Sequence, residues 1–123
     1  MSQLKIETVD SKMAFLPGEE IKGIAVWQLD RQSDAIEVRL FWRTEGRGNL
    51  NVGVADTVRF DNPPMEGGQP FVLHAPNGPY SFYGKLVILV WAIELVVLPQ
   101  NEAECISITI SPTGEAINLA GSE

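Results

Sequence analysis

The chain has 123 residues, of which 45% are hydrophobic and 20% are charged, a composition typical of one folded domain. Its formal net charge of −7 disfavours nonspecific binding to nucleic acid or to anionic membranes, because both need a cationic surface. Cys105 is the lone cysteine, which excludes an internal disulfide and fits a reducing compartment. Its setting in "ECISITI" is typical of a small buried apolar residue. The first residues lack the apolar segment of a secretory signal, so we expect a cytoplasmic protein.

Hydrophobic residues recur with a period of two through the first part of the chain, which predicts half-buried strands and no helix. Three segments, 4–9, 21–29 and 35–43, alternate in this way. The residues expected on their inward faces are Leu4, Ile6 and Thr8, then Ile21, Gly23, Ala25, Trp27 and Leu29, then Ile36, Val38, Leu40 and Trp42.

Three more strands are predicted further along, at 50–60, 71–75 and 104–110, the first with a bend or bulge between Gly53 and Asp56. The Pro- and Gly-rich segment 61–70 is expected to be a loop and a variable contact surface. Closely spaced turn signals and the lack of a helical pattern predict an antiparallel, immunoglobulin-like β-sandwich of about seven or eight strands. We assign the sandwich to residues 1–112 and a flexible C-terminal tail to residues 113–123.

The segment 86–98 is almost entirely apolar. It is shorter than the ~20 residues of a membrane-spanning helix and contains Glu94, so no membrane span is expected. β-Branched and aromatic residues predict a long central strand instead. One face of that strand belongs to the core and the other needs a cover of loops, of a partner or of a second copy of the chain. The face of Leu86, Ile88, Val90, Ala92 and Glu94 is taken as the core side, and the opposite face carries Val87, Leu89, Trp91, Ile93 and Leu95.

No motif for catalysis, metal or cofactor binding stands out. His74 is the lone histidine, and its place within a strand predicts a surface or hydrogen-bonded residue. An enzyme in which His74 acts with a nearby Asp or Glu is the less favoured reading, since no nucleophile elbow accompanies it. Carboxylates at the turns near Glu19 and Asp30 are typical of solvated loops, and a calcium site in these loops is the alternative interpretation. We therefore expect neither an enzyme nor a cofactor.

Two segments resemble the arrestin-like family, which includes α-arrestins, Vps26-type retromer subunits and Spo0M-type sporulation-control proteins. Residues 15–29, "FLPGEEIKGIAVWQL", are similar to the family's F-x-PG-[DE] turn and the strand that follows it. Residues 71–97, "FVLHAPNGPYSFYGKLVILVWAIELVV", are similar to its aromatic strand, proline-containing turn, P-x-SF-x-G motif and long apolar strand. The resemblance covers about residues 4–110 and corresponds to one N-terminal arrestin-type sandwich. The phosphate-sensing residues of visual arrestins have no counterpart here.

The resemblance implies a non-enzymatic adaptor or scaffold domain that binds other proteins or copies of itself. The residues expected to take part are Tyr80, Phe82, Trp91, Ile93, Leu95 and Val97. The alternative is a small-ligand or carbohydrate-binding sandwich, which would need Trp27, Trp42 or Trp91 exposed as a stacking platform.

Overall fold

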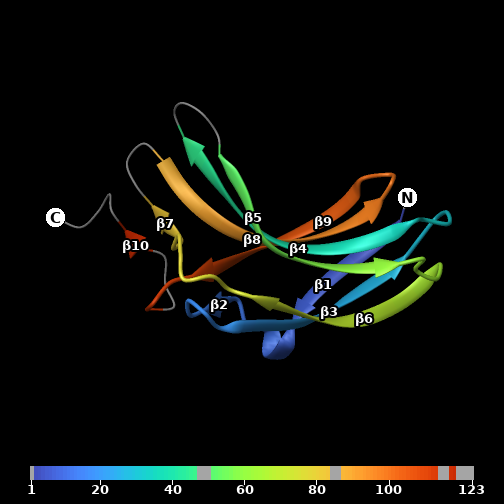
Figure 1. The fold of residues 1–123 in the computed structure, drawn as a ribbon, viewed down its shortest axis with the longest axis horizontal. Coiled ribbons are helices and arrows are strands. Elements are labelled where there is room, and N and C mark those ends of the chain that lie inside the picture. The colour runs from blue at the N-terminus through green and yellow to red at the C-terminus, as the bar shows by residue number, and fades with distance from the viewer. Residues whose placement is uncertain (1, 47–50, 84–86, 114–116, 119–123) are drawn as a thin grey trace.

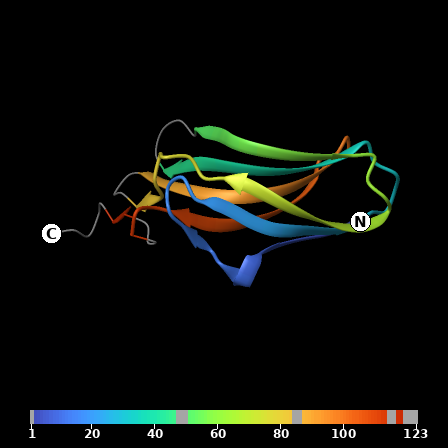
Figure 2. The same ribbon diagram turned by 60° about the horizontal axis from the view of Figure 1, so that its bottom comes forward.

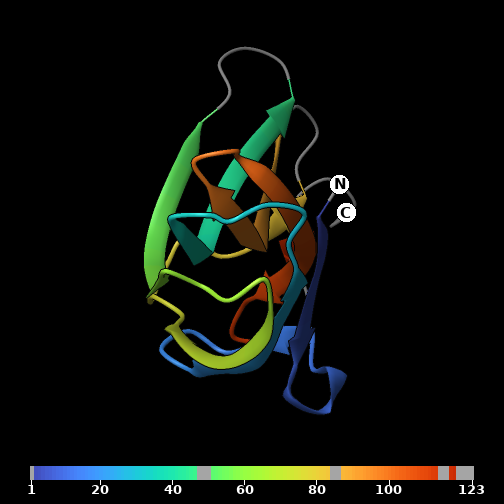
Figure 3. The same ribbon diagram turned by 90° about the vertical axis from the view of Figure 1, so that its right-hand side faces the viewer.

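The computed structural model describes residues 2–46, 51–83, 87–113 and 117–118. Within these residues ten strands and one short 3-10 turn, η1 (Val9–Ser11), form two packed layers (Figures 1 and 3). The smaller layer is an antiparallel sheet in the order β1-β3-β6, with β3 in the middle (Figure 2). Its strands are β1 (Gln3–Thr8), β3 (Glu20–Gln28) and β6 (Glu66–His74).

The larger layer is a seven-stranded sheet built around β8. It runs in the order β10-β7-β8-β4-β5, with β9 also paired to β8 and β2 paired to β9. Its strands are β2 (Ala14–Phe15), β4 (Ala35–Gly46), β5 (Val52–Asp61), β7 (Phe82–Tyr83), β8 (Val87–Leu98), β9 (Glu102–Ile110) and β10 (Ile117–Asn118). The predicted β-sandwich is therefore confirmed. The two short pairs β2–β9 and β7–β10 are parallel, which the prediction of an antiparallel fold did not include.

The core lies between the layers and consists largely of the inward residues that alternation predicted. Ile21, Ala25 and Trp27 of β3 are buried, and so are Ile36 and Leu40 of β4. The bulge expected in β5 is also present. Leu40 pairs with Asp56 and the next residue of β4 pairs with Val54, so Ala55 has no partner in the ladder.

The two family-like segments meet in the smaller sheet, where residues 20–23 of β3 pair with residues 71–74 of β6. Gly18 adopts a φ of +79°, and its N–H donates to the carbonyl of Ala75 over 3.0 Å. Gly23 admits the ring of Phe71, since an added Cβ would lie 2.6 Å from that ring and 2.5 Å from the carbonyl oxygen of Glu7. Each glycine permits a backbone conformation or a close contact that this sheet needs, so this part of the resemblance is a signature of the fold.

The turn that precedes β7 is fixed by two buried side chains. The indole N–H of Trp91 donates to the carbonyl of Pro79 over 2.8 Å, and Ser81 Oγ accepts from the backbone N–H of Ile110 over 3.1 Å. Ser81 N–H also donates to the carbonyl of Ile110. Since buried polar groups must find partners, the "PYSF" sequence is explained by anchoring of this turn to β8 and β9.

Two sequence predictions, on the loop at 61–70 and on Cys105, need correction, and a third, on the C-terminal tail, is not tested. The loop expected at 61–70 is shorter, because β5 continues to Asp61 and β6 begins at Glu66. Glycine and proline suggested a loop, yet β6 is an edge strand, where both are tolerated. Cys105 is exposed on the outer side of β9, opposite Glu94, and is not buried. Among residues 113–123, only Thr113 and β10 are described, so the flexible tail lies mostly outside the described residues.

The orientation of β8 is the reverse of the expected one. Its core side carries Leu89, Trp91, Ile93, Leu95 and Val97, all buried. The other side, with Ile88, Val90, Ala92 and Glu94, faces outward; Leu86 lies outside the described residues. The described residues contain no helix long and apolar enough to cross a membrane.

Candidate functional site on the smaller sheet

The outer face of the smaller sheet has an apolar centre. Alternation turns every second residue of β1, β3 and β6 away from the core, and such positions are usually polar. Here Ile24, Val26 and Val72 point outward and are 40%, 39% and 39% exposed. Pro70 pairs with Ile24 across the strands and extends the same surface. We call the outward residues of β1, β3 and β6 the small-sheet face.

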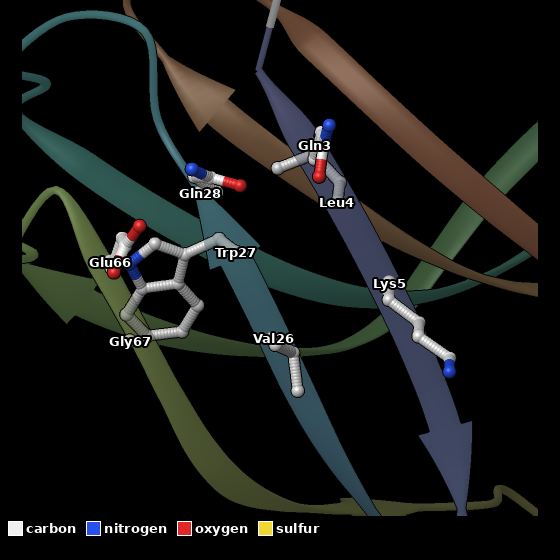
Figure 4. Close-up of a pocket in the computed structure, with 8 residues that line it drawn as sticks. All are labelled: Gln3, Leu4, Lys5, Val26, Trp27, Gln28, Glu66 and Gly67. Atoms are coloured by element: carbon white, nitrogen blue, oxygen red, sulfur yellow. The ribbon is translucent and has the colours of Figure 1, made fainter.

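A groove of about 530 Å³ opens at one end of the small-sheet face (Figure 4). Val26 stands at its centre, with β1 on one side and the first residues of β6 on the other. The volume falls within the range of pockets that hold small ligands or a few side chains. The groove is lined by Gln3, Leu4, Lys5, Val26, Trp27, Gln28, Glu66 and Gly67.

Two glycines of β6 lie at this groove: Gly67 lines it, and Gly68 pairs with Val26, which also lines it. Gly67 lies against Trp27, and a Cβ there would approach the indole to 3.0 Å. Gly68, the partner of Val26 in the ladder, has more room, because a Cβ would meet its nearest atoms at ordinary van der Waals distances of 3.6 to 3.9 Å. A larger side chain at position 68 can therefore project over Val26 without displacing the backbone.

The rim of the groove is polar and unevenly charged. Lys5 stands on the β1 side and Glu66 on the β6 side (Figure 4). Lys5 Nζ forms an ion pair with Glu7 over 2.9 Å, whereas Glu66 makes no ion pair among the residues the structure describes. Gln3 and Gln28 add amide groups that can donate and accept hydrogen bonds. An apolar floor with a few polar rim groups is typical of a binding surface.

The outer face of the larger sheet is divided into two parts. In the first, Glu37 accepts hydrogen bonds from Arg39 Nε over 2.9 Å and from Arg59 Nη1 over 2.7 Å. Arg39 also lies 3.7 Å from Glu94, and Arg59 donates to Asp61 over 2.8 Å. The bond from Arg39, helped by Arg59, holds the pKa of Glu37 below its ordinary value even though partial burial acts in the opposite direction. This network covers the part of β8 near Val96, which is buried.

The second part of that face is apolar and more open. Val52 and Val54 of the edge strand β5 are 66% and 59% exposed. Val54 pairs with Phe41 of β4. Arg43, the next outward residue of β4, pairs with Val52 on one side and with Val90 of β8 on the other. Both Phe41 and Val90 are half-buried. We call Phe41, Val52, Val54 and Val90 the large-sheet apolar patch. Side chains of the same domain thus cover the second apolar face of β8 at one end only.

The residues predicted to bind a partner lie elsewhere. Trp91, Ile93, Leu95 and Val97 are completely buried between the sheets, so they build the core and present no surface to a partner. Tyr80 is half-buried in the turn before β7. Phe82 belongs to β7, and its side chain lies outside the described residues. The expected binding role of the four core residues is therefore corrected to a structural one.

The geometry does not support the alternative sites, which are a tryptophan stacking platform, a catalytic His74 and a metal site. The Trp27 and Trp91 rings are buried, and Trp42, half-buried, packs over Gly53, where a Cβ would lie 2.4 Å from its indole nitrogen. His74 is exposed between two carboxylates, with Nδ1 3.4 Å from Asp56 and Nε2 3.6 Å from Glu20. Across the described part of the chain, no group of three or more His, Cys, Asp or Glu residues could hold a metal ion.

Cys105 is a poor candidate nucleophile. Desolvation, followed by the neighbouring Glu94 carboxylate, raises the pKa of its thiol, although Arg43 acts in the opposite direction. Since the thiolate is the reactive form, a raised pKa lowers its population at neutral pH.

Sequence reasoning missed the small-sheet face, although a signal for it was present. In "EIKGIAVWQ" the outward positions of β3 are held by Glu20, Lys22, Ile24, Val26 and Gln28. Two β-branched apolar residues in the middle of an otherwise polar series indicate a surface that is not simply solvated. The pairing of this stretch with Val72 and Gly68 could not be read from the sequence, because it depends on the register with β6.

Comparison with known proteins bears on the fold. The structure is similar to Spo0M, a sporulation control protein from Bacillus subtilis, with a TM-score of 0.63 and 17% sequence identity. The match covers 89% of this chain and 49% of that protein, so the chain spans about half the length of its solved relative. A weaker similarity, TM-score 0.48 and 8% identity over 94% of this chain and 16% of the other, is to a β-glucosidase from Listeria innocua. No protein-family model and no curated protein matches the sequence. The arrestin-like, Spo0M-type sandwich expected from the two sequence segments is thus confirmed as the fold of this chain.

Proposed function

We propose that this chain is a non-enzymatic protein-interaction domain, of the adaptor or scaffold kind, and that the small-sheet face binds its partner. One observation carries the proposal: outward Ile24, Val26 and Val72 adjoin an open groove of about 530 Å³ on a regular sheet. Exposed apolar side chains gathered beside a concave surface with a polar rim favour association. The free thiol of Cys105 is consistent with the reducing, cytoplasmic setting that we propose for it.

The chemistry of the groove supports binding over catalysis. Its rim offers one ammonium group, one carboxylate and two amides. The residues that line it include no serine, threonine or cysteine that a neighbouring base could activate as a nucleophile. The Spo0M-like fold is compatible with a regulatory or adaptor role, which we extend to this chain by analogy.

A groove-filling substitution tests the proposal. Gly68→Leu places a side chain over Val26 in a position where a Cβ makes only ordinary contacts. Gly78→Ala is the matched control, because nothing lies within 4 Å of a Cβ at that exposed glycine. Proteins captured by the immobilised wild-type domain from its native lysate are compared with those captured by each variant, after thermal melts show that both are folded. We expect specific partners to be lost with Gly68→Leu and kept with Gly78→Ala. Identical sets for all three proteins would refute the assignment of this face.

A second role, self-association, is favoured by the large-sheet apolar patch. Val52 and Val54 lie on the edge strand β5, where exposed apolar residues favour pairing between chains. We propose that a second copy covers this patch. Sedimentation equilibrium at several micromolar concentrations should then show a dimer that Val54→Lys dissociates and Val72→Lys, on the other face, does not. A wild-type monomer throughout would refute self-association and leave the small-sheet face as the sole candidate.

A further inference from the structure

We infer that the groove on the small-sheet face binds an extended segment of another protein in which an apolar side chain stands next to a lysine or arginine. This inference rests on the proposed function and names the chemistry of the partner. It follows from the shape of the floor and from Glu66, a rim carboxylate with no ion-pair partner among the residues that the structure describes.

The shape selects an apolar anchor. The floor is a pleated sheet on which Val26 projects, while Gly68, its partner in the ladder, has no side chain, so a hollow lies beside a ridge. An apolar side chain of the partner can enter that hollow and contact both Val26 and the exposed edge of the sheet. Side chains of an extended segment alternate in direction, so one enters the groove while its neighbours reach the rim.

The charges on the rim select a basic neighbour. Glu66 carries a carboxylate with no ion pair in the described part of the chain, whereas Lys5 already pairs with Glu7. Lys22, also on the small-sheet face, does not line the groove. The unbalanced charge at the groove is therefore negative, and the net charge of −7 adds a field of the same sign. Both effects favour a lysine or arginine of the partner beside Glu66.

The same charges disfavour an acidic occupant. An acidic segment would place its carboxylates against Glu66 without relief from Lys5, which is held by Glu7. We therefore assign a foreign basic segment to the groove, while the proposed self-association concerns the uncharged side chains of the large-sheet apolar patch.

Panning of a random dodecapeptide phage library identifies the preference directly. Wild-type domain and Gly68→Leu are panned in parallel at low salt, with Gly78→Ala as the folded control. We expect peptides recovered by wild type and by Gly78→Ala, but not by Gly68→Leu, to contain an apolar residue beside Lys or Arg. Groove-dependent peptides that are acidic or show no charge preference would overturn this inference and leave the proposed function standing. An absence of groove-dependent peptides would overturn both.

A pair of carboxylate variants then separates contact at Glu66 from the overall field. Glu66→Gln and Glu20→Gln remove one charge each from the small-sheet face, but Glu20 lies at its far end, opposite His74. The affinity of a recovered synthetic peptide is measured by fluorescence anisotropy. We expect Glu66→Gln to weaken binding about three- to fivefold at low salt, as for a solvent-exposed ion pair, and Glu20→Gln to have little effect. Equal losses for the two variants would overturn the assignment of the basic residue to Glu66.

Discussion

The carboxylate of Asp56 accepts a hydrogen bond from the backbone N–H of His74 over 2.8 Å, and so joins the two sheets at one corner of the sandwich. Asp56 belongs to β5 of the larger sheet and His74 to β6 of the smaller one. The bond occupies a donor on the free edge of β6. Pro70 lacks an N–H and lies four residues earlier, where alternation points its nitrogen to the same edge. Together they make this edge a poor template for a further strand.

Removal of this carboxylate should weaken the corner. Asp56→Ala leaves the N–H of His74 without its partner, and we expect the free energy of unfolding to fall by about 1–2 kcal/mol. Chemical denaturation measures the loss, and amide hydrogen exchange of His74 should accelerate. His74→Ala is the matched control, because it keeps the backbone N–H and removes only the exposed ring; it should cost less than about 0.5 kcal/mol. A larger loss for His74→Ala than for Asp56→Ala would show that the ring, and not the backbone, joins the sheets.

Gly23 and Gly68 should respond oppositely to the same substitution. At Gly23 a Cβ would lie 2.5 Å from the carbonyl oxygen of Glu7 and 2.6 Å from the ring of Phe71, so Gly23→Ala forces the sheet or the ring to shift. We expect a loss of about 1–3 kcal/mol, as for other overpacked sites. Gly68→Ala meets only ordinary contacts and should be neutral or slightly stabilising. Thermal melts of the two variants test the difference, and equal melting temperatures would contradict it.

The ion-pair network on the larger sheet should make stability depend on pH through Glu37. Its pKa in the folded protein lies below the ordinary value of 4.5, chiefly because of Arg39. The stabilisation is therefore complete above that value and is lost as the pH falls below it toward the folded-state pKa. Glu37→Gln should lower the free energy of unfolding by about 1 kcal/mol at neutral pH, and the difference from wild type should shrink in acid. Urea denaturation at a series of pH values measures this, with Glu104→Gln, at an exposed position of β9, as the charge-matched control.

The buried hydroxyl of Ser81 should contribute to stability more than its size suggests. Ser81→Ala removes the acceptor of the Ile110 N–H and leaves that buried donor unpaired, so we expect a loss of about 1–3 kcal/mol. Ser107→Ala, at an exposed position of β9, should change stability by less than about 0.5 kcal/mol. Denaturant titrations compare the two. Equal effects would mean that Ser81 does not anchor the turn.

Much of the fold could be predicted because the strands with the clearest alternation have one solvent-exposed face and one buried face. The alternation in β3 and β4 identified their core residues, and Gly53 to Asp56 correctly indicated a bulge. The turn at Gly18 was also expected, since its backbone needs a positive φ.

Features that depend on pairing between distant strands could not be predicted. Both faces of β8 are apolar, so periodicity could not decide which one is buried, and the binding residues inferred from it proved to be core. Its register with β4 and β9 decides the matter, and that register is not written in the local pattern. The groove was missed for the same reason, since Val26 and Gly68 meet only when β3 and β6 pair.

The contrast between Gly23 and Gly68 has a consequence for how such a domain can change over time. The first glycine is enclosed by atoms of neighbouring strands, and the second has room for a Cβ beside Val26, which lines the groove. Mutations that disturb folding and mutations that alter recognition therefore fall at different positions of the same small sheet. A lineage carrying this domain could exchange one partner for another by single substitutions at outward positions, while the scaffold beneath stays intact.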